Sequence, residues 1–379
     1  MIRILFFIEK FSYNGSIGGA EKVLITLVNN MNPRRFDITV QTVFPDSFAS
    51  LLKEHIHYKY CYKNKNRMTT LLYRTEAETG IIYRRCIKDD YDIEVAFLEY
   101  DTTKVIAAST NNRAKKAAWV HCDLNIAVKD KARFVRKTEK QYKEFDQIVC
   151  VSEQCRRSFR EIFSGKFDPV VLHNVIDDEE IRRKANQSLA DGVQKRKTVL
   201  CSVGSFSPPK NHRRLLRACK RLRSEGHDFE LWLVGDGMLR TEIEKYINDN
   251  NLEETVRLFG FQANPYPFMR AADLLVCSSD YEGFSTFITE GVILKKRILT
   301  TDCSGMQDIL GGYPAGRIVA NNDEAFYNAL VEYFQQPEDI DISASASNRF
   351  SIQKLVNENE SFFEALINGS FELPEYSKQ

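Results

Sequence analysis

The chain has 379 residues, which is long enough for two domains that each bury a hydrophobic core. Its 53 basic and 52 acidic residues almost cancel, so the overall charge does not favour nucleic acid as a partner. Its nine cysteines are scattered without a C-x-x-C motif, which predicts reduced thiols in a cytoplasmic protein rather than a disulfide framework or a zinc site.

The N-terminal run "RILFFI" is too short for a signal peptide and predicts a buried first strand. No stretch approaches the roughly 18 apolar residues that a membrane-spanning helix needs. Further apolar runs follow, namely "DITVQTV", "DIEVAFL", "KAAWVH" and "QIVCVS", and amphipathic segments such as 21–31 and 129–145 separate them. Strands that alternate with helices in this way indicate a parallel sheet covered on both faces. Residues 1–176 therefore predict a doubly wound α/β domain.

The alternation begins again after residue 197. The predicted strands are "TVLCSVG", "FELWLVG", "VRLFGF", "ADLLVCSS" and "RILTTD", with helices predicted at 211–224 and 239–250. A second doubly wound domain is therefore predicted at 177–350.

A charged stretch, residues 177–197, joins the two predicted domains. It is the best linker candidate, and it could equally be the solvated face of a helix. At the other end of the chain, residues 351–379 include the apolar spacing of a closing helix.

Ligands of doubly wound sheets bind outside the carboxyl ends of the strands, so the loops there are the candidate sites. After the first strand, Gly18 and Gly19 permit close approach of the backbone at the start of a helix, the alternative being a simple tight turn. The G-x-G-x-x-G fingerprint is absent, which disfavours a dehydrogenase.

The loop after "TVLCSVG" holds Ser205, two prolines and Lys210 just before a predicted helix. A lysine at a helix N-terminus opposes the helix dipole, so it indicates an anion at that place. Lys210 is therefore a candidate ligand of a diphosphate, and the alternative is a solvated surface lysine.

The segment "YEGFSTFITEG" places Glu282 in a loop and Glu290 in the helix that follows. Eight residues span about 12 Å along a helix, which does not suit two carboxylates that act on one bond, as in a glycosidase. The spacing suits one long ligand, contacted at one end by the loop carboxylate and further along by the helix carboxylate. The N-terminus of this helix, near Phe284 or Ser285, is a natural place for phosphate.

Seven segments, taken in chain order, resemble the retaining glycosyltransferases of family 4. They are "GGAEKVL", "WVHCD", "VLHNVID", "VGSFSPPKNH", "LVGDG", "LFGF" and "YEGFSTFITEG" with its E-x7-E spacing. The resemblance implies the α/β fold called GT-B, in which two Rossmann-like domains face a cleft. It implies that residues 1–176 bind the acceptor, that 177–350 bind a nucleotide-sugar, and that the helix in 351–379 packs back on the first domain.

The resemblance also implies a role for individual side chains. Glu290 would hold the ribose hydroxyls, Glu282 and the backbone amides after it the transferred sugar, and Lys210 the diphosphate. His121, after "KAAWV", would reach the sugar from the other domain, so that the implied catalytic residues are His121, Glu282 and Lys210; as an alternative, His121 is an ordinary core residue. The residues implied to contact the donor are Gly18, Gly19, Ser205, Lys210, Phe261, Gly283, Phe284, Ser285, Thr286 and Glu290.

One departure from the family lies beside Lys210, where Ser205 stands in place of a common arginine. Arg213 or Arg214 could supply the missing cation, or donor affinity could be weak. No D-x-D motif lies in a plausible site loop, since "DID" at 339–341 follows a surface-like stretch. We therefore expect neither a metal nor another cofactor, and the nucleotide-sugar is a co-substrate.

The predicted function is retaining transfer of a hexosyl or N-acetylhexosaminyl group from a nucleotide-diphospho-sugar, with UDP favoured, to a hydroxyl of a glycan or lipid-linked acceptor in cell-surface polysaccharide synthesis. The alternatives are a sugar-nucleotide epimerase of the same fold and a non-catalytic sugar-nucleotide-binding protein, which Ser205 favours.

Residues 113–144 carry ten basic and four acidic side chains, and Trp119, Phe134, Val135 and Tyr142 are interleaved with them. Such a segment could rest on the anionic inner face of the membrane and meet a lipid-linked glycan, and the alternative is an ordinary charged helix face.

Overall fold

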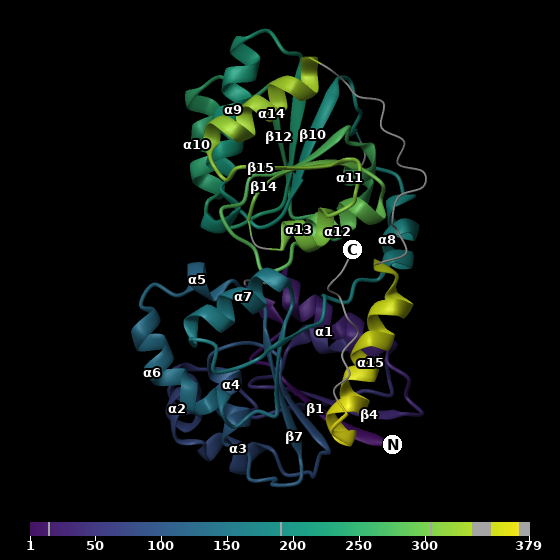
Figure 1. Cartoon of the computed structure of the whole chain (residues 1–379). Helices are drawn as coiled ribbons and strands as arrows, with labels where there is room; N and C mark the ends of the chain where they lie inside the picture. Colours follow the sequence, from purple (N-terminus) through teal and green to yellow (C-terminus); the bar gives the residue numbers. More distant parts are fainter. Residues whose placement is uncertain (14–15, 190–191, 304, 336–349, 371–379) are drawn as a thin grey trace. The chain divides into compact units, whose positions relative to one another are not determined.

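In the computed structural model, residues 1–13, 16–189, 192–303, 305–335 and 350–370 are described. The chain divides into two compact units. The first unit comprises Met1–Ile176 and Ile352–Gln379, and the second comprises Asp177–Ser351. Each unit is a parallel sheet with helices on both faces (Figure 1), so the predicted α/β fold with two doubly wound domains is confirmed.

The first unit is built on a seven-stranded parallel sheet in the order β5-β4-β1-β6-β7-β8-β9. The chain winds outward from β1 in one direction and then returns to add β6 on the other side, so the loops after β1 and β6 flank a topological switch point. The strands are β1 (Ile2–Phe7), β4 (Phe36–Thr42), β5 (His57–Tyr60), β6 (Ile93–Ala96), β7 (Lys115–Val120), β8 (Gln147–Cys150) and β9 (Val170–Val171).

A short antiparallel pair of strands and a set of helices complete this unit. The pair is β2 (Ser12–Tyr13) with β3 (Ser16–Ile17). The helices are α1 (Gly19–Asn30), the 3-10 helix η1 (Ser47–Leu51), α2 (Arg67–Thr79), α3 (Ile81–Cys86), α4 (Asp101–Ala107), α5 (Leu124–Ala127), α6 (Lys131–Tyr142), α7 (Glu153–Ile162) and α15 (Ile352–Asn368).

The central strands of the first unit are apolar along most of their length because helices cover both faces of the sheet. Ile4, Leu5, Phe6 and Phe7 of β1 are all fully buried. This burial explains why the run "RILFFI" shows no alternation of polar and apolar residues.

Helix α15 packs on the first unit although 175 residues of the second unit, Asp177–Ser351, separate it from the rest of that unit in the chain. The ring of Phe363 lies 5.6 Å from that of Phe6 in β1, edge to face. Glu360 pairs with Arg35 at 2.6 Å and accepts a hydrogen bond from the backbone of Asn32. Apolar and charged contacts together thus fix α15; residues 371–379 of the predicted closing segment lie outside the described residues.

The second unit is built on a six-stranded parallel sheet in the order β12-β11-β10-β13-β14-β15. Its switch point lies between β10 and β13, because β11 and β12 extend the sheet on one side and β14 and β15 on the other. The strands are β10 (Thr198–Val203), β11 (Phe229–Val234), β12 (Val256–Gly260), β13 (Leu274–Cys277), β14 (Arg297–Thr301) and β15 (Gly316–Val319). The helices are α8 (Asp178–Ala185), η2 (Pro208–Lys210), α9 (His212–Ser224), α10 (Arg240–Asp249), α11 (Tyr266–Ala271), α12 (Thr286–Ile293), α13 (Met306–Leu310) and α14 (Asp323–Gln335).

The first part of the charged stretch at 177–197 is helix α8 and belongs to the second unit. Ile181 and Ala185 are 2% exposed, and α8 contacts α11 and α12. Ion pairs such as Lys184 with Glu180 at 2.7 Å cover the solvent side. Of the two readings of this stretch, a solvated helix face therefore describes α8.

All nine cysteines are free thiols, and six of them are buried. No helix in the described part of the chain is both long and apolar enough to span a membrane.

Candidate active site

Two loops meet at the switch point of the second unit, one after β10 and one after β13. The Ser278 hydroxyl, just after β13, donates to the carbonyl oxygens of Lys210 at 3.0 Å and Asn211 at 3.1 Å. The backbone N–H of Asp280 donates to the Pro209 carbonyl at 2.8 Å. These bonds hold together two loops that are about 70 residues apart in the chain.

The two loops bring Lys210 and Glu282 into an ion pair. Lys210 Nζ lies 2.6 Å from Glu282 Oε1, and the Ser279 hydroxyl donates to the same oxygen at 2.8 Å. The side chains are 27% and 11% exposed, so the pair is only partly reached by water. Burial lowers the pKa of Lys210, but the charge and hydrogen bond of Glu282, together with Cys277 and Cys303, raise it by more, so that the pKa lies above its usual value. Lys210 is therefore a held, positive group at the carboxyl edge of the sheet.

The anion that the position of Lys210 indicated is thus Glu282 of the chain itself. Lys210 ends the 3-10 turn η2, and Asn211, with φ 42°, caps helix α9. A diphosphate at this edge of the sheet would compete with Glu282 for the Lys210 ammonium group. A sugar there could donate hydroxyl hydrogen bonds to the Glu282 carboxylate.

The N-terminus of α12 opens directly beside Glu282. The helix begins at Thr286, and Ser285 at its N-cap makes no capping hydrogen bond. Ser285 is 2% exposed, and within the described residues its hydroxyl has no hydrogen-bond partner. The loop at Gly283 is packed closely, since a Cβ at Gly305 would lie 2.6 Å from the Gly283 carbonyl. Gly283, Phe284, Ser285 and Thr286 thus form a rigid helix start next to the ion pair.

Glu290 lies further along α12 and is 6% exposed. The Tyr266 hydroxyl of α11 donates to its Oε1 at 3.0 Å. Glu282 and Glu290 therefore have different surroundings, one paired with a lysine in a loop and the other held by a phenol within a helix. This difference disfavours two equivalent carboxylates that act on one bond.

Ser205 is exposed in the loop after β10, and its hydroxyl lies 3.0 Å from that of Ser207. Arg214, one candidate for the missing cation, is 6% exposed and holds its own domain together. Its guanidinium donates to Asp323 and Asn321 at 3.1 and 2.7 Å and also to the loop after β13. Arg214 is therefore committed to structure, whereas Arg213 is exposed.

Phe261 follows β12, directly after Gly260, which has a φ of 65°. Its ring is 57% exposed, which is unusual for a phenylalanine and leaves an aromatic face open at the same edge of the sheet.

His121 belongs to the first unit, where it follows β7. Its pKa is lowered to about 4 by burial, against a hydrogen bond with the backbone of Phe97, so the ring is neutral at pH 7. Its Nε2 is buried and, in the described part of the chain, has no hydrogen-bond partner. Glu99, after β6, accepts hydrogen bonds from the backbone N–H groups of His121 and Cys122 and so fixes the turn. Sequence reasoning missed Glu99, although it also follows a predicted strand.

Gly18 and Gly19 lie at the start of α1, and they differ in what surrounds them. A Cβ at Gly18 would lie 1.9 Å from Glu21 Oε2, whereas one at Gly19 would meet no atom within 4 Å. Gly18 thus leaves room for the buried carboxyl of Glu21, and Gly19 leaves open space. Burial raises the pKa of Glu21 to about 7, with Lys10 opposing the shift and Asp46 and Glu9 adding to it.

Glu21→Gln should flatten the dependence of stability on pH. The carboxyl has a pKa of 4.5 when unfolded and about 7 when folded, so its contribution to stability is complete below pH 4.5 and is lost as the pH rises through 7. At about 1.36 kcal/mol per unit, the loss is on the order of 3 kcal/mol between those limits. Thermal unfolding at pH 5 and pH 8 measures it, and the variant should lose less Tm than the parent.

The control is Glu242→Gln, which changes an exposed glutamate in the first turn of α10. Its Tm should follow the parent curve. If the Tm of the parent and that of Glu21→Gln changed equally with pH, Glu21 would ionise in the folded protein without loss of stability.

No group of three or more His, Cys, Asp or Glu side chains is arranged to hold a metal ion within the described ranges. The "DID" at 339–341 lies outside the described residues.

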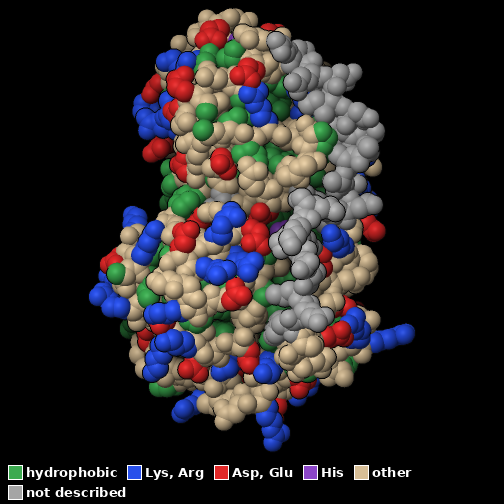
Figure 2. All heavy atoms as spheres, in the orientation of Figure 1, with side chains coloured by type: hydrophobic (Ala, Val, Ile, Leu, Met, Phe, Trp, Pro, Cys, Tyr) green, Lys and Arg blue, Asp and Glu red, His purple; other side chains and the backbone are tan. Residues whose placement is uncertain are grey.

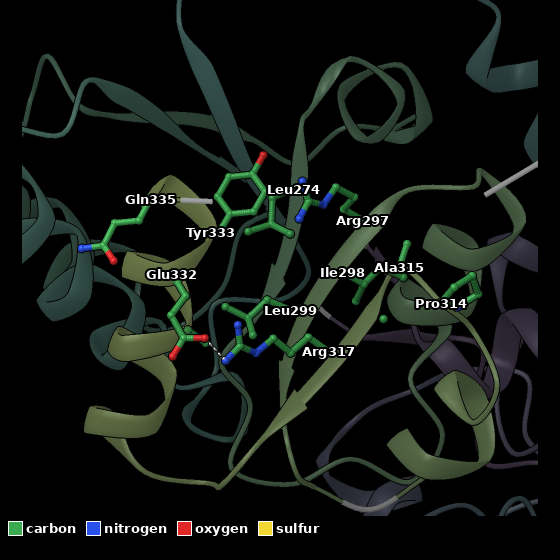
Figure 3. A pocket seen from close by; sticks show the side chains of 12 residues that line it. Leu274, Arg297, Ile298, Leu299, Pro314, Ala315, Arg317, Glu332, Tyr333 and Gln335 are labelled. Atoms are coloured by element: carbon green, nitrogen blue, oxygen red, sulfur yellow. Dashed lines mark hydrogen bonds and ion pairs between the residues drawn. The ribbon is translucent and has the colours of Figure 1, made fainter. Parts of the chain in front are cut away.

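A cavity of about 630 Å³ lies at the opposite edge of the second sheet. It is lined by Leu274, Arg297 and Gly316, the first residues of β13, β14 and β15 (Figure 3). Two basic side chains enter it already engaged: Arg297 lies 4.7 Å from the ring of Tyr333, and Arg317 pairs with Glu332. Because Lys210 and Glu282 follow the carboxyl ends of β10 and β13, this cavity is separate from the candidate active site.

Residues 183–347, most of the second unit, match the model of the family described as "Glycosyl transferases group 1". Two solved structures share the fold of the chain. HepE from Anabaena in complex with UDP and glucose gives a TM-score of 0.74 at 19% identity, covering 96% of this chain and 100% of that one. Sucrose-phosphate synthase from Thermosynechococcus elongatus gives 0.78 at 14% identity, covering 98% and 100%.

The family match thus lies in the second unit, and the solved structures share the α/β fold over nearly the whole chain. A Campylobacter jejuni relative is 28% identical over 330 residues, which are 84% of this chain and 88% of the relative. That protein is N-acetylgalactosamine-N,N'-diacetylbacillosaminyl-diphospho-undecaprenol 4-alpha-N-acetylgalactosaminyltransferase. A lipopolysaccharide core biosynthesis glycosyltransferase of Rhizobium meliloti is 29% identical over 153 residues, 40% of this chain and 42% of the relative.

Proposed function

We propose that this protein is a GT-B glycosyltransferase that moves a hexosyl or N-acetylhexosaminyl group from a UDP-sugar to a hydroxyl of a lipid-linked glycan, with retention of configuration and without a metal. The observation that carries the proposal is the Lys210–Glu282 ion pair at the switch point, beside the N-terminus of α12. A lysine and the backbone amides of a helix start suit the diphosphate of a nucleotide-sugar, and a carboxylate suits the hydroxyls of its sugar.

The charge that develops when the sugar leaves resides on the diphosphate. Lys210 and the amides of Gly283 to Thr286 would stabilise it more strongly as the bond breaks, so their help is larger in the transition state than in the bound donor. Glu282 would hold sugar hydroxyls and keep the reacting carbon in place. Glu290 would accept the ribose hydroxyls, and the exposed ring of Phe261 would stack on the base.

Two residues of the first unit, His121 and Gly19, are proposed as further contacts of the donor. The neutral ring of His121 presents an unpartnered Nε2 that can accept a sugar hydroxyl. An open backbone at Gly19 leaves room for an anion at the start of α1. Gly18 serves the packing of Glu21, and so supports this turn without itself offering space.

The acceptor is proposed from the Campylobacter relative, whose name specifies an undecaprenol-linked glycan and an α linkage. Complexes of HepE with UDP favour UDP as the nucleotide. A lipid-linked acceptor suits a cytoplasmic protein that works on the inner face of the membrane in polysaccharide synthesis.

Residues 113–144 would contribute mainly charge to such a contact. Trp119, Phe134 and Tyr142 are 3%, 8% and 1% exposed, because they pack into the first unit, whereas Lys131, Arg133, Arg136, Lys137 and Lys140 of α6 are exposed. These three aromatic residues were therefore wrongly interpreted as part of the membrane-facing surface, Val135 is half-buried, and Ile126 is the exposed large apolar side chain of the segment.

Release of UDP from UDP-sugars, measured with and without a lipid-linked glycan acceptor, tests the proposal. We expect release that acceptor increases and that a chelator leaves nearly unchanged. Loss of release with chelator, restored by magnesium or manganese, would overturn the metal-free site. Binding of UDP without release would support a non-catalytic binding protein, and conversion of the sugar without release would support an epimerase.

Ser205→Arg should tighten the binding of UDP. Ser205 is exposed next to the Lys210 loop, and an arginine there would bring a bidentate phosphate ligand, with an expected gain of about 1 to 3 kcal/mol. Titration calorimetry with UDP measures the gain, and Ser205→Gln is the control for side-chain length without charge. An unchanged affinity in an active enzyme would mean that another cation, such as Arg213, already fills the role.

A further inference from the structure

An exposed apolar stripe runs along the outer face of helix α2, and Ile81, the first residue of the neighbouring helix α3, is exposed as well. Met68 is 72% exposed, Leu71 66%, Leu72 44% and Ile81 52%. Among the described residues, twelve large hydrophobic side chains are exposed, and these four stand within 14 positions of one another. Single exposed apolar residues are ordinary, but a cluster on one helix marks an interaction surface.

Helix α2 carries apolar side chains on its solvent-exposed side as well as on its buried side. Positions 68, 71 and 72 follow the i, i+3, i+4 spacing of one face, and that face points outward. Its inner face is apolar too, since Tyr73 and Ala77 are 3% and 2% exposed in the core. The core therefore does not need Met68, Leu71 and Leu72, and their exposure requires another explanation.

Basic side chains surround this stripe, and the nearby acidic ones are already paired. Residues 63–88 contain seven Lys and Arg but only two Glu. Those two, Glu76 and Glu78, pair with Arg85 and Lys104. Arg67 and Arg74 flank the stripe on one side of α2, are exposed, and make no ion pair within the described residues.

Helix α4 contacts both α2 and the basic helix α6, and Figure 1 shows the three side by side in the first unit. Figure 2 shows Lys and Arg side chains over that part of the unit, with hydrophobic side chains among them. The apolar stripe therefore lies in a basic surrounding.

We propose that the outer face of α2, with Met68, Leu71, Leu72 and Ile81, docks on an anionic lipid surface. The apolar side chains would enter the region between headgroups and acyl chains, and Arg67, Arg74 and the exposed cations of α6 would contact lipid phosphates. This rests on the proposed use of a lipid-linked acceptor and extends it, because α2 exposes a cluster of large apolar side chains, whereas residues 113–144 expose Ile126.

A second copy of the chain fits the stripe less well. A helix of 13 residues is about 20 Å long at about 1.5 Å per residue, and a stripe of four side chains along it is far smaller than the roughly 800 Å² per partner of a stable dimer. Binding to an anionic lipid surface requires no complementary shape, only apolar side chains that can be buried and basic side chains that can contact phosphates.

The test is flotation of the full chain with phosphatidylcholine vesicles, with and without phosphatidylglycerol. The parent should float only with the anionic vesicles. Leu71→Ser with Leu72→Ser should weaken partitioning by about tenfold or more, and Arg67→Gln with Arg74→Gln should reduce the preference for anionic vesicles. Leu51→Ser, which changes an equally exposed leucine (51%) of η1, should leave partitioning unchanged.

Circular dichroism and UDP binding verify that each variant is folded with its donor site intact, and Met68→Ser provides a second, milder change of the stripe. Equal flotation of the parent and the Leu71/Leu72 variant overturns the proposal. The proposal is also overturned if the parent does not bind vesicles but sediments as a dimer, and the Leu71/Leu72 variant sediments as a monomer. Flotation measures vesicle binding and does not depend on sugar transfer. The result therefore stands even if the proposed transferase activity is not found.

Discussion

Glu282→Gln is expected to lower kcat by about 10² to 10³, which corresponds to about 2.7 to 4 kcal/mol of lost transition-state stabilisation. Glu282 is the carboxylate that meets the sugar in the proposed site, where charge develops. The substitution keeps the shape of the side chain but removes its charge and replaces one acceptor oxygen by an NH2 group that donates. It also removes the counterion of Lys210, which then has only the diphosphate as its anion. UDP alone should therefore bind as well as to the parent, or better.

Glu290→Gln is the matched comparison, because it changes the other glutamate of the same segment. Glu290 lies in the helix, held by Tyr266, and would contact a part of the donor that does not react. Its substitution should weaken UDP binding by about 1.5 to 3 kcal/mol and raise the donor KM, with the smaller effect on kcat. Steady-state kinetics and UDP titration separate the two. If both variants lost kcat to the same extent and bound UDP as the parent does, the two glutamates would instead act as a general acid/base pair.

The sequence was sufficient to predict that Lys210 and Glu282 lie near each other, because topology determines where loops meet. Lys210 and Glu282 follow strands β10 and β13, which neighbour each other although β11 and β12 come between them in the chain. Any doubly wound sheet brings such loops together at its switch point. A strand pattern and two charged residues were therefore enough to predict the neighbourhood, though not that the two would pair.

Side-chain partners that stabilise the site could not be predicted from spacing. Tyr266 holds Glu290 from another helix, and Glu99 fixes the turn of His121 from the neighbouring strand end. Both contacts depend on how helices and loops pack across the sheet, which leaves no periodic signal in the chain. Arg214 shows the reverse error, because a basic residue near Lys210 was a candidate phosphate ligand and is instead buried in a network with Asp323 and Asn321.

Apolar residues in a basic segment do not reveal which way they face. Trp119, Phe134 and Tyr142 suggested a partly apolar surface, yet all three are buried, whereas Leu71 and Leu72 of α2 are exposed. A helix with apolar residues on both faces gives a weak periodic signal, and only packing decides which face becomes the core.

Lys210→Met is expected to weaken UDP binding by about a hundredfold or more. The variant removes the cation that would face the diphosphate and leaves the Glu282 carboxylate, 11% exposed, without its partner. A buried charge stripped of its partner costs about 2 to 5 kcal/mol, and here the stranded charge has the same sign as the ligand. Titration calorimetry with UDP measures the loss, and Lys220→Met, which changes an exposed lysine of α9, should leave affinity unchanged.

Adding Glu282→Gln to Lys210→Met should recover part of that loss, because the double variant no longer places an unpaired carboxylate against the diphosphate. The coupling energy of the pair is the difference between the effect of the double variant on UDP binding and the sum of the two single effects, and it is expected at about 1 to 3 kcal/mol for residues in contact. The double variant should recover UDP affinity but not kcat. It has no Lys210 to stabilise the charge of the diphosphate and no Glu282 carboxylate to hold the sugar. Effects that simply add would mean that UDP never comes between Lys210 and Glu282, and the diphosphate would then have to be placed elsewhere along the carboxyl edge of the sheet.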